Sequence, residues 1–176
     1  KVTHQGIVIE TLPLNYSVIS DSLNNDDTII ALDQVTDPQN VGAIIRTFNF
    51  FGGKNLIITK DHSSEINGSL AKSASGALEN INIIKVPNLS MALKNLRKKG
   101  FIIIGLDENG DVLLHNTKDY RNEKKVLVMG SEGKGLRRLT RENCDFLVSI
   151  ANNNNNSDFN TLNVSVSSAL ALYEFM

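Results

Sequence analysis

Short apolar runs that alternate with helical patterns constrain this chain more than any other feature. Six runs of four to six residues have the aliphatic composition of strands buried on both faces: Thr28–Leu32, Asn55–Ile58, Ile83–Val86, Phe101–Leu106, Lys125–Met129 and Phe146–Ile150. Five segments between or after them have helical spacing: Val41–Phe51, Glu65–Ser75, Ser90–Lys99, Leu136–Glu142 and Leu162–Phe175. This alternation predicts an α/β domain, a mostly parallel sheet with helices on both faces. Since ligands bind beyond the carboxyl ends of such strands, we expect a site in the loops after Leu32, Met129 and Ile150.

Composition excludes several classes of protein. The chain has 176 residues, of which 41% are hydrophobic and 21% charged, as in an ordinary globular domain. A single cysteine, Cys144, excludes an internal disulfide framework, and three scattered histidines suggest no metal site, so we expect a reducing, cytoplasmic setting and no metal. No apolar run approaches the roughly 18 to 20 residues of a membrane span. The net charge of −1 provides no global positive field for nucleic acid.

The first 27 residues differ from the rest. They combine a short apolar run, a proline and an acidic, asparagine-rich turn, which predicts a linker or ordered arm ahead of a domain over 28–176. Because residue 1 is lysine rather than methionine, we expect the chain to be a fragment or a processed form.

The loop after the first strand is followed by an amphipathic helix. Asp37-Pro38 is a turn signal, and Asn40 suits the N-cap of the helix. The apolar face of that helix consists of Val41, Ile44, Ile45 and Phe48. Gly42 and Arg46 lie on the opposite face with Asn49, so Gly42 is expected to leave backbone open to a ligand beneath Arg46. The alternative is a simple cap and a solvated arginine.

The loop after Met129 contains three glycines in six positions, Gly130, Gly133 and Gly135, directly after a buried strand. They permit tight turns and close approach by a ligand. Their spacing matches neither a phosphate-binding loop nor a dinucleotide fingerprint, and Glu132 would repel phosphate. The loop therefore favours a cationic or neutral ligand, although a turn without a ligand remains an alternative.

The last segment is apolar on several faces. One face of the expected helix consists of Leu162, Val166, Ala169, Leu170 and Tyr173, and other faces carry Val164, Ala171, Leu172 and Phe175. Because one sheet face cannot cover such a helix, we expect a second copy of the chain to cover the remainder. Asn163 is either the helix cap or a positioned hydrogen-bonding group. The asparagine run at 152–156 is expected to be a solvated loop.

Three segments, taken in order, resemble the motifs of the SpoU-type (TrmH-like) ribose 2′-O-methyltransferases of the SPOUT superfamily. They are Asp37–Gly42 with Arg46, Val128–Leu136, and Leu162–Val166. The stretches His4–Ile7 and Leu139–Asp145 are similar to the 23S rRNA guanosine branch of that family.

The resemblance implies a C-terminal deep trefoil knot, a homodimer, and S-adenosylmethionine as cofactor, with S-adenosylhomocysteine as product. It implies methylation of a ribose 2′-hydroxyl in structured RNA, a guanosine of 23S rRNA, with tRNA as the alternative substrate. Members of this branch carry an N-terminal RNA-binding domain. Residues 1–27 are therefore expected to be the linker from such a domain, and 28–176 the catalytic domain.

The resemblance also implies roles for individual residues. The expected cofactor-binding residues are Gly130, Ser131, Gly135, Ile150, Ala151 and Leu162. The expected catalytic residues are Arg46, Asn40, Glu132, Asn163 and Thr161. Family members are proposed to use this arginine as a general base, but a guanidinium with a pKa above about 12 is better suited to orienting the hydroxyl and a flanking phosphate. Phosphate contacts are also expected from two basic clusters, which equally suit solvated helices: Lys134, Arg137, Arg138 and Arg141, and Arg97, Lys98 and Lys99.

The third motif departs from the family pattern. Ala151 and Asn152 follow Ile150 where the family has proline and an apolar residue. Loss of the proline predicts a looser pocket and weaker cofactor binding. It leaves open a second reading, a knotted RNA-binding or dimerisation module without catalysis. A nicotinamide-dependent oxidoreductase is disfavoured because its glycine fingerprint is absent.

Overall fold

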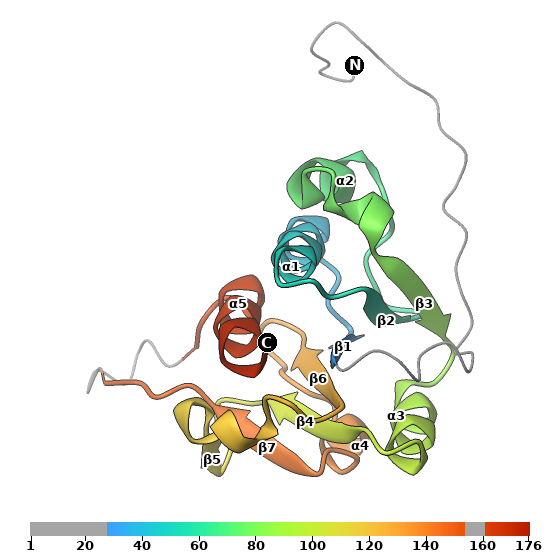
Figure 1. The fold of residues 1–176 in the computed structure, drawn as a ribbon. Coiled ribbons are helices and arrows are strands. Elements are labelled where there is room, and N and C mark those ends of the chain that lie inside the picture. Colours follow the sequence, from blue (N-terminus) through green and yellow to red (C-terminus); the bar gives the residue numbers. More distant parts are fainter. Residues whose placement is uncertain (1–27, 154–160) are drawn as a thin grey trace, which may run out of the picture.

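The computed structural model describes residues 28–153 and 161–176. Within them, seven strands form one parallel sheet in the order β3-β2-β1-β6-β4-β7-β5 (Figure 1). The strands are β1 (Thr28–Asp33), β2 (Asn55–Thr59), β3 (Asn82–Val86), β4 (Ile102–Leu106), β5 (Val112–Leu113), β6 (Lys125–Gly130) and β7 (Phe146–Ser149).

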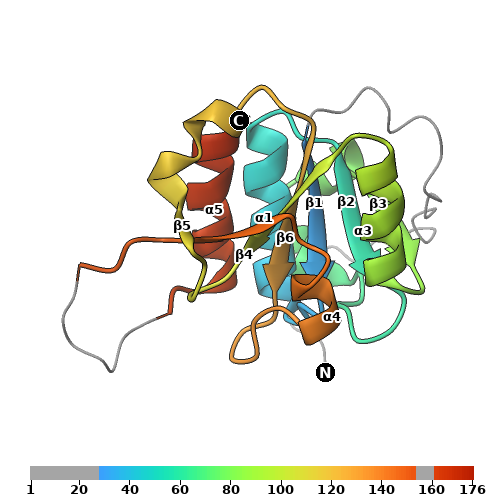
Figure 2. The same cartoon turned by 90° about the horizontal axis from the view of Figure 1, so that it is seen from below.

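Helices cover both faces of this sheet. They are α1 (Pro38–Phe50), α2 (Gly68–Ala74), α3 (Leu89–Lys98), α4 (Arg138–Arg141) and α5 (Val164–Phe175), with short 3-10 helices η2 (Ala77–Asn80), η3 (Leu114–Asn116) and η4 (Lys118–Tyr120). Helices α1, α2 and α5 lie on one face, while α3 and α4 lie on the other (Figures 1 and 2). The predicted α/β class with a parallel sheet is therefore confirmed.

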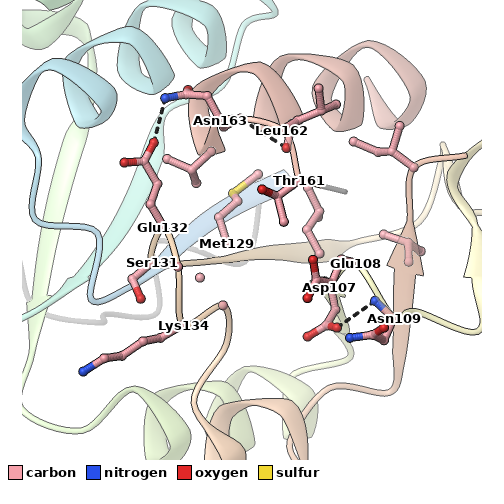
Figure 3. Close-up of a pocket in the computed structure, with 18 of the residues that line it drawn as sticks. Asp107, Glu108, Asn109, Met129, Ser131, Glu132, Lys134, Thr161, Leu162 and Asn163 are labelled. Carbon is pink, nitrogen blue, oxygen red and sulfur yellow. Dashed lines mark hydrogen bonds between the residues drawn. The ribbon is translucent and has the colours of Figure 1, made fainter. Parts of the chain in front are cut away.

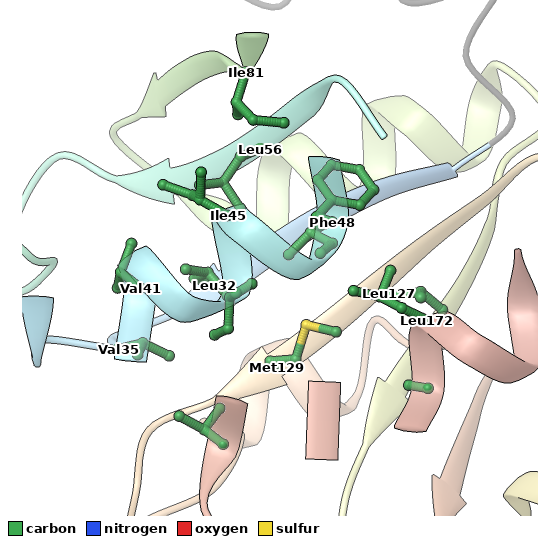
Figure 4. Packing of buried hydrophobic residues seen from close by; sticks show 14 of the residues in the cluster. Leu32, Val35, Val41, Ile45, Phe48, Leu56, Ile81, Leu127, Met129 and Leu172 are labelled. Atoms are coloured by element: carbon green, nitrogen blue, oxygen red, sulfur yellow. The ribbon is translucent and has the colours of Figure 1, made fainter. Parts of the chain in front are cut away.

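Alternate residues of the central strand β1 enter two separate cores, because successive side chains of a strand point to opposite faces. Ile30 and Leu32 pack with α1 and α5, in the cluster that also holds Phe48 and Leu172 (Figure 4). Ile29 and Ala31 pack with α3 on the opposite face. This double burial explains why the strands are continuous apolar runs.

All six predicted strands and all five predicted helices occur, with ends shifted by a few residues. The sequence analysis missed β5, because two residues at a sheet edge are too short to show a pattern. The cap of α1 is a correction. Asp37 is the N-cap and accepts a hydrogen bond from the Gln39 backbone N–H at 3.0 Å. Asn40 therefore lies inside the helix, and its role as a cap was wrong.

Gly42 is the second correction. A Cβ at this position would lie 2.6 Å from both the Leu70 carbonyl oxygen and the Ser73 Cβ of α2. The glycine thus lets α1 and α2 approach closely, and the expectation that it leaves backbone open to a ligand was wrong.

Helix α5 buries only one of its faces. Val164, Ala171, Leu172 and Phe175 are buried. The face predicted to be apolar is exposed instead, with Leu162 50%, Val166 48%, Leu170 42% and Tyr173 70% accessible. The prediction that one face of the sheet cannot cover the helix completely is confirmed for the described residues.

Some predictions lie outside the described residues. These are the expected linker over 1–27 and the asparagine run from residue 154 onward. In the part of the chain that the structure does describe, no helix has the length and apolar character to span a bilayer.

Candidate functional site

A cavity of about 780 Å³ opens at the carboxyl ends of β4, β6 and β7 (Figure 3). All six residues expected to bind a cofactor line it: Gly130, Ser131, Gly135, Ile150, Ala151 and Leu162. Three of the five expected catalytic residues also line it: Glu132, Thr161 and Asn163. Two of the loops singled out in the sequence, those after β6 and β7, therefore converge on one hollow, which has the size of an ordinary small-molecule site.

The glycine loop after β6 is closed at its base. A Cβ on Gly130 would lie 2.2 Å from the Gly135 carbonyl carbon, and Gly135 donates its N–H to the Ser131 carbonyl at 2.9 Å. Gly133 and Gly135 have positive φ angles of 82° and 63°, which side chains disfavour. The glycines thus form a tight loop that carries Glu132 near its tip.

Asp33, at the end of β1, anchors this loop. Its side chain is 0% exposed, and its two oxygens accept from the backbone N of Arg137 at 2.9 Å and from the Nε of Arg137 at 2.6 Å. Asp33 is also the register partner of Gly130 in the sheet. Both ends of the loop are therefore held at one residue, Gly130 by strand pairing with the Asp33 backbone and Arg137 by the buried Asp33 carboxylate.

Three side chains from three distant segments form a network beside the cavity. Oε1 of Glu132 accepts from Asn40 Nδ2 at 2.9 Å and from Asn163 Nδ2 at 2.6 Å. Asn163 Nδ2 also donates to Asn40 Oδ1 at 3.0 Å. Figure 3 shows Glu132 and Asn163 pointing toward each other across the edge of the cavity. Among the described residues, Oε2 of Glu132 has no hydrogen-bond partner, so one carboxylate oxygen remains for a ligand.

Asn163 has both of the roles considered for it. Its Oδ1 accepts from the backbone N–H of Ser165 at 2.8 Å and from the Ser165 hydroxyl at 2.6 Å, which caps α5. Its amide nitrogen simultaneously joins the network with Glu132. One residue therefore couples the start of α5 to the glycine loop.

Arg46 does not line this cavity. It is exposed on α1, six residues beyond Asn40, and lines a second cavity of about 500 Å³. The structure thus brings Asn40, Glu132 and Asn163 together and places Arg46 apart from them in the single chain.

The loop after β4 contributes residues that the sequence analysis missed. Asp107, Glu108 and Asn109 line the larger cavity together with Arg141. The Asp107 side chain is 2% exposed; its Oδ2 lies 2.6 Å from Arg141 Nη2 and its Oδ1 accepts from the Asn109 N–H at 3.0 Å. The polar run that directly follows the buried strand β4 could have indicated this loop. The sequence analysis instead singled out the loops after Leu32, Met129 and Ile150.

The basic clusters are largely neutralised by carboxylates. Besides the pairs of Arg137 and Arg141, Arg138 pairs with Glu142 at 2.6 Å and Arg97 with Asp145 at 3.0 Å. Lys134 has no hydrogen bond or ion pair to any described residue. These side chains have less charge to offer to RNA phosphates than the sequence suggested.

The described residues support neither a nucleophilic cysteine nor a metal centre. Burial raises the pKa of the Cys144 thiol from 9.0 to about 12, so this cysteine is a poor nucleophile. Across 28–153 and 161–176, no group of three or more His, Cys, Asp or Glu side chains is placed to hold a metal ion. The cavity is lined by the carboxylate-bearing Glu132, by glycines and by apolar residues, which suit a cationic ligand.

The chain matches a protein family. The family model described as the SpoU rRNA Methylase family matches residues 27–173. The chain is 40% identical to the 23S rRNA (guanosine-2′-O-)-methyltransferase RlmB of Ralstonia nicotianae, over 97% of this chain and 68% of that protein. It is 38% identical to the protein of the same name from Pseudomonas aeruginosa, over 98% of this chain and 70% of that one.

Solved structures are similar as well. The AdoMet-bound rRNA methyltransferase of Sinorhizobium meliloti has a TM-score of 0.78 and 26% identity, covering 92% of this chain and 60% of its own. The SpoU methyltransferase AviRb of Streptomyces viridochromogenes, in complex with AdoMet, has a TM-score of 0.72 and 25% identity, covering 93% and 58%. The chain thus spans about two thirds of these curated relatives and about three fifths of these solved chains.

Proposed function

The chain belongs to the SpoU rRNA methylase family, and we propose that it transfers a methyl group from S-adenosylmethionine to a ribose 2′-hydroxyl of 23S rRNA, at a guanosine. The family predicted from the three sequence segments is confirmed, and with it the class of enzyme, an RNA methyltransferase. The RNA, the nucleotide and the residues that act are the content of the proposal.

One observation carries the proposal. Asn40 is 92 positions from Glu132 and 123 positions from Asn163, yet the three side chains are hydrogen-bonded to one another beside a cavity that Glu132 and Asn163 line. These are the three segments that resemble the family's motifs. We infer from this convergence of distant segments that the cavity holds and orients a ligand.

The residues of the cavity fit S-adenosylmethionine. The cavity's size suits a molecule of this class, and Glu132, which lines it, would stabilise the sulfonium charge with its carboxylate. We propose that Gly130, Ile150 and Leu162 shape the pocket with their backbone atoms. Once bound, the cofactor supplies a methyl group that is already activated by its positively charged sulfur.

The side chains of the protein then mainly position the cofactor and the ribose hydroxyl. Glu132 has its carboxylate oriented by the amides of Asn40 and Asn163, so little reorganisation is needed when a charged ligand enters. Thr161, at the cavity wall, offers a hydroxyl that both donates and accepts a hydrogen bond. Together these side chains bring the ribose hydroxyl into line and exclude water.

For Arg46 we propose a role on the RNA. A guanidinium that remains charged is a poor base but a good partner for a phosphate. In the part of the chain that the structure describes, Arg46 forms no hydrogen bond or ion pair, so its charge is available. It would hold the phosphate beside the target ribose and orient the hydroxyl.

We also propose a homodimer, in which the exposed face of α5 packs against the same face of a second copy. Val166, Leu170 and Tyr173 form an apolar stripe along α5, and such stripes are rarely left in water. Sedimentation should show a dimer for the wild type and a monomer for Leu170→Glu. A wild type that remains monomeric at micromolar concentration would contradict the dimer.

Three further parts of the proposal concern the knot, the domain boundaries and the cellular location. We propose that the C-terminal segment forms the trefoil knot of the SPOUT superfamily, which an experimental trace of the whole chain will decide. Residues 28–176 would be the catalytic domain and 1–27 the linker from an RNA-binding domain. With rRNA as substrate, a cytoplasmic location follows.

The test is transfer of a tritiated methyl group from S-adenosylmethionine to unmodified 23S rRNA, with unmodified tRNA as a parallel substrate. We expect incorporation into rRNA by the wild type and a loss of at least about tenfold in Arg46→Ala. Met91→Ala, on the opposite face of the sheet, is the control. Incorporation into tRNA alone would change the substrate, and cofactor binding without transfer to either RNA would favour the module without catalysis.

A further inference from the structure

The second cavity, of about 500 Å³, has a composition unlike that of the first. It lies between α1 and the segment joining α2 to η2, and is lined by Arg46, Thr47, Asn49, Phe50, Ser75, Gly76, Ala77 and Asn80. None of the expected cofactor residues reaches it. It combines a cation, an aromatic ring and two side-chain amides in one hollow.

Phe50 is the most unusual member of this set. Its side chain is 82% exposed, although burying a phenylalanine is strongly favourable. Its ring lies edge-on to that of Phe51, with centroids 5.3 Å apart and an interplanar angle of 87°. The neighbouring ring thus orients Phe50 while leaving most of its surface open to the solvent.

The polar members of this set line the same cavity as the Phe50 ring. Arg46 lies one turn before Phe50 on the helix, and its guanidinium has no partner among the described residues. Asn80, which also lines the cavity, donates a long hydrogen bond of 3.5 Å to Asn49. So weak a bond is readily exchanged for a ligand. The amides therefore remain available as donors and acceptors.

A ribonucleotide needs this combination of groups. Proteins recognise unpaired RNA bases by stacking them on aromatic rings and by hydrogen bonds to the base edges, while arginine holds the phosphate. We propose that the second cavity is a subsite for an unpaired nucleotide of the substrate RNA, with its base stacked on Phe50 and its edge contacting Asn49 and Asn80. This inference rests on the proposed function, since it assumes an RNA substrate.

The position of the subsite fits that role. Arg46 follows Asn40 by six residues on α1, about 9 Å along the helix axis at 1.5 Å per residue. Asn40 belongs to the network beside the larger cavity. A nucleotide at Phe50 would thus flank the target nucleotide, with the Arg46 charge at the phosphate between them. The apolar stripe proposed for the dimer lies on α5, on the other side of α1 from α2 (Figure 1).

Two substitutions of Phe50 separate stacking from simple apolar contact. Phe50→Leu keeps an apolar side chain but removes the ring, whereas Phe50→Tyr keeps the ring. Filter binding of unmodified 23S rRNA at fixed salt should show about tenfold weaker affinity for Phe50→Leu and an unchanged affinity for Phe50→Tyr, within about twofold. Asn80→Ala should weaken affinity by about threefold. Met91→Ala, an exposed apolar residue on α3, is the matched control and should change nothing.

The outcomes separate this inference from the proposed function. Equal affinities for wild type and Phe50→Leu would overturn the subsite, while binding and methyl transfer by the wild type would leave the proposed function intact. Sedimentation of each variant completes the experiment. If Phe50→Leu lowers RNA affinity only together with a loss of the dimer, Phe50 is a protein contact and the subsite is overturned. A wild type that binds no rRNA would overturn both.

Discussion

Two carboxylates, at opposite ends of the glycine loop, are used in contrasting ways. Asp33 is fully buried, and Arg137 occupies both of its oxygens. Glu132, near the tip of the loop, is exposed; two amides hold one of its oxygens, and no residue that the structure describes bonds the other. The first holds the loop in place, and the second presents a charge to the cavity.

The difference follows from the cost of burying charge. A carboxylate removed from water must be compensated by ion pairs and hydrogen bonds, so the contacts of Asp33 are needed for stability. An exposed carboxylate keeps its hydration until a ligand replaces it, so Glu132 is free to serve a ligand. The loop therefore has a structural end and a functional end, and four experiments test that division.

The first experiment probes the structural end of the loop through the reactivity of Cys144, and its expected effect is the largest of the four. It packs against the hydrophobic cluster that includes Leu136, directly before Arg137, and burial raises the pKa of its thiol from 9.0 to about 12. At pH 8 the thiolate fraction should fall about a thousandfold below that of the unfolded chain, and alkylation should slow accordingly. Between pH 9 and 12 the folded chain retains a proton that the unfolded chain has lost, so the free energy of unfolding should decrease as pH rises. Equal alkylation rates with and without urea would contradict a buried thiol.

Arg137→Met should break the anchor. It leaves the buried Asp33 with only a backbone partner, which we expect to lower the free energy of unfolding by about 3 kcal/mol. Arg138→Met is the control, because the Arg138–Glu142 pair is exposed and such pairs contribute about 0.5 kcal/mol or less. Urea denaturation followed by circular dichroism measures both. Equal losses in the two variants would show that Asp33 is not the anchor.

Glu132→Gln should do the opposite and impair function without affecting stability. The glutamine preserves the shape of the side chain but removes its charge, so methyl transfer to 23S rRNA should fall by about thirtyfold. The free energy of unfolding should stay within about 0.5 kcal/mol of wild type. A variant that unfolds more readily yet transfers normally would reverse the assignment of the two ends.

Ala151→Pro, at the wall of the same cavity, should have the smallest effect of the four, a change in cofactor affinity. Proline would reduce the freedom of the loop after β7 in the cofactor-free protein, so less conformational entropy is lost when the cofactor binds. We expect S-adenosylmethionine to bind about twofold more tightly to Ala151→Pro by calorimetry. Weaker binding in the variant would show that alanine suits this position better than the family's proline.

Much of the site could be inferred from sequence because its polypeptide segments have local signatures. The glycines after β6, the turn at Asp37-Pro38 and the asparagine before α5 are each typical of a turn or a cap. The loop after β4 was missed, since Asp107 is an ordinary polar residue until the fold pairs it with Arg141. Gly42 was misread because the contact that requires a glycine comes from α2, some 30 residues later in the chain.

The amino-acid sequence alone determined the alternation of strands and helices, the closed glycine loop and the family, because periodicity and turn chemistry depend on neighbouring residues. Only the tertiary structure decided which polar side chains meet. Asp33 and Arg137 are 104 positions apart, and Asn40 and Asn163 are 123 apart. Their contacts depend on the register of β1 with β6 and on where α5 packs, and no local pattern encodes either. The same holds for Phe50, whose exposure follows from the orientation of α1 against the sheet.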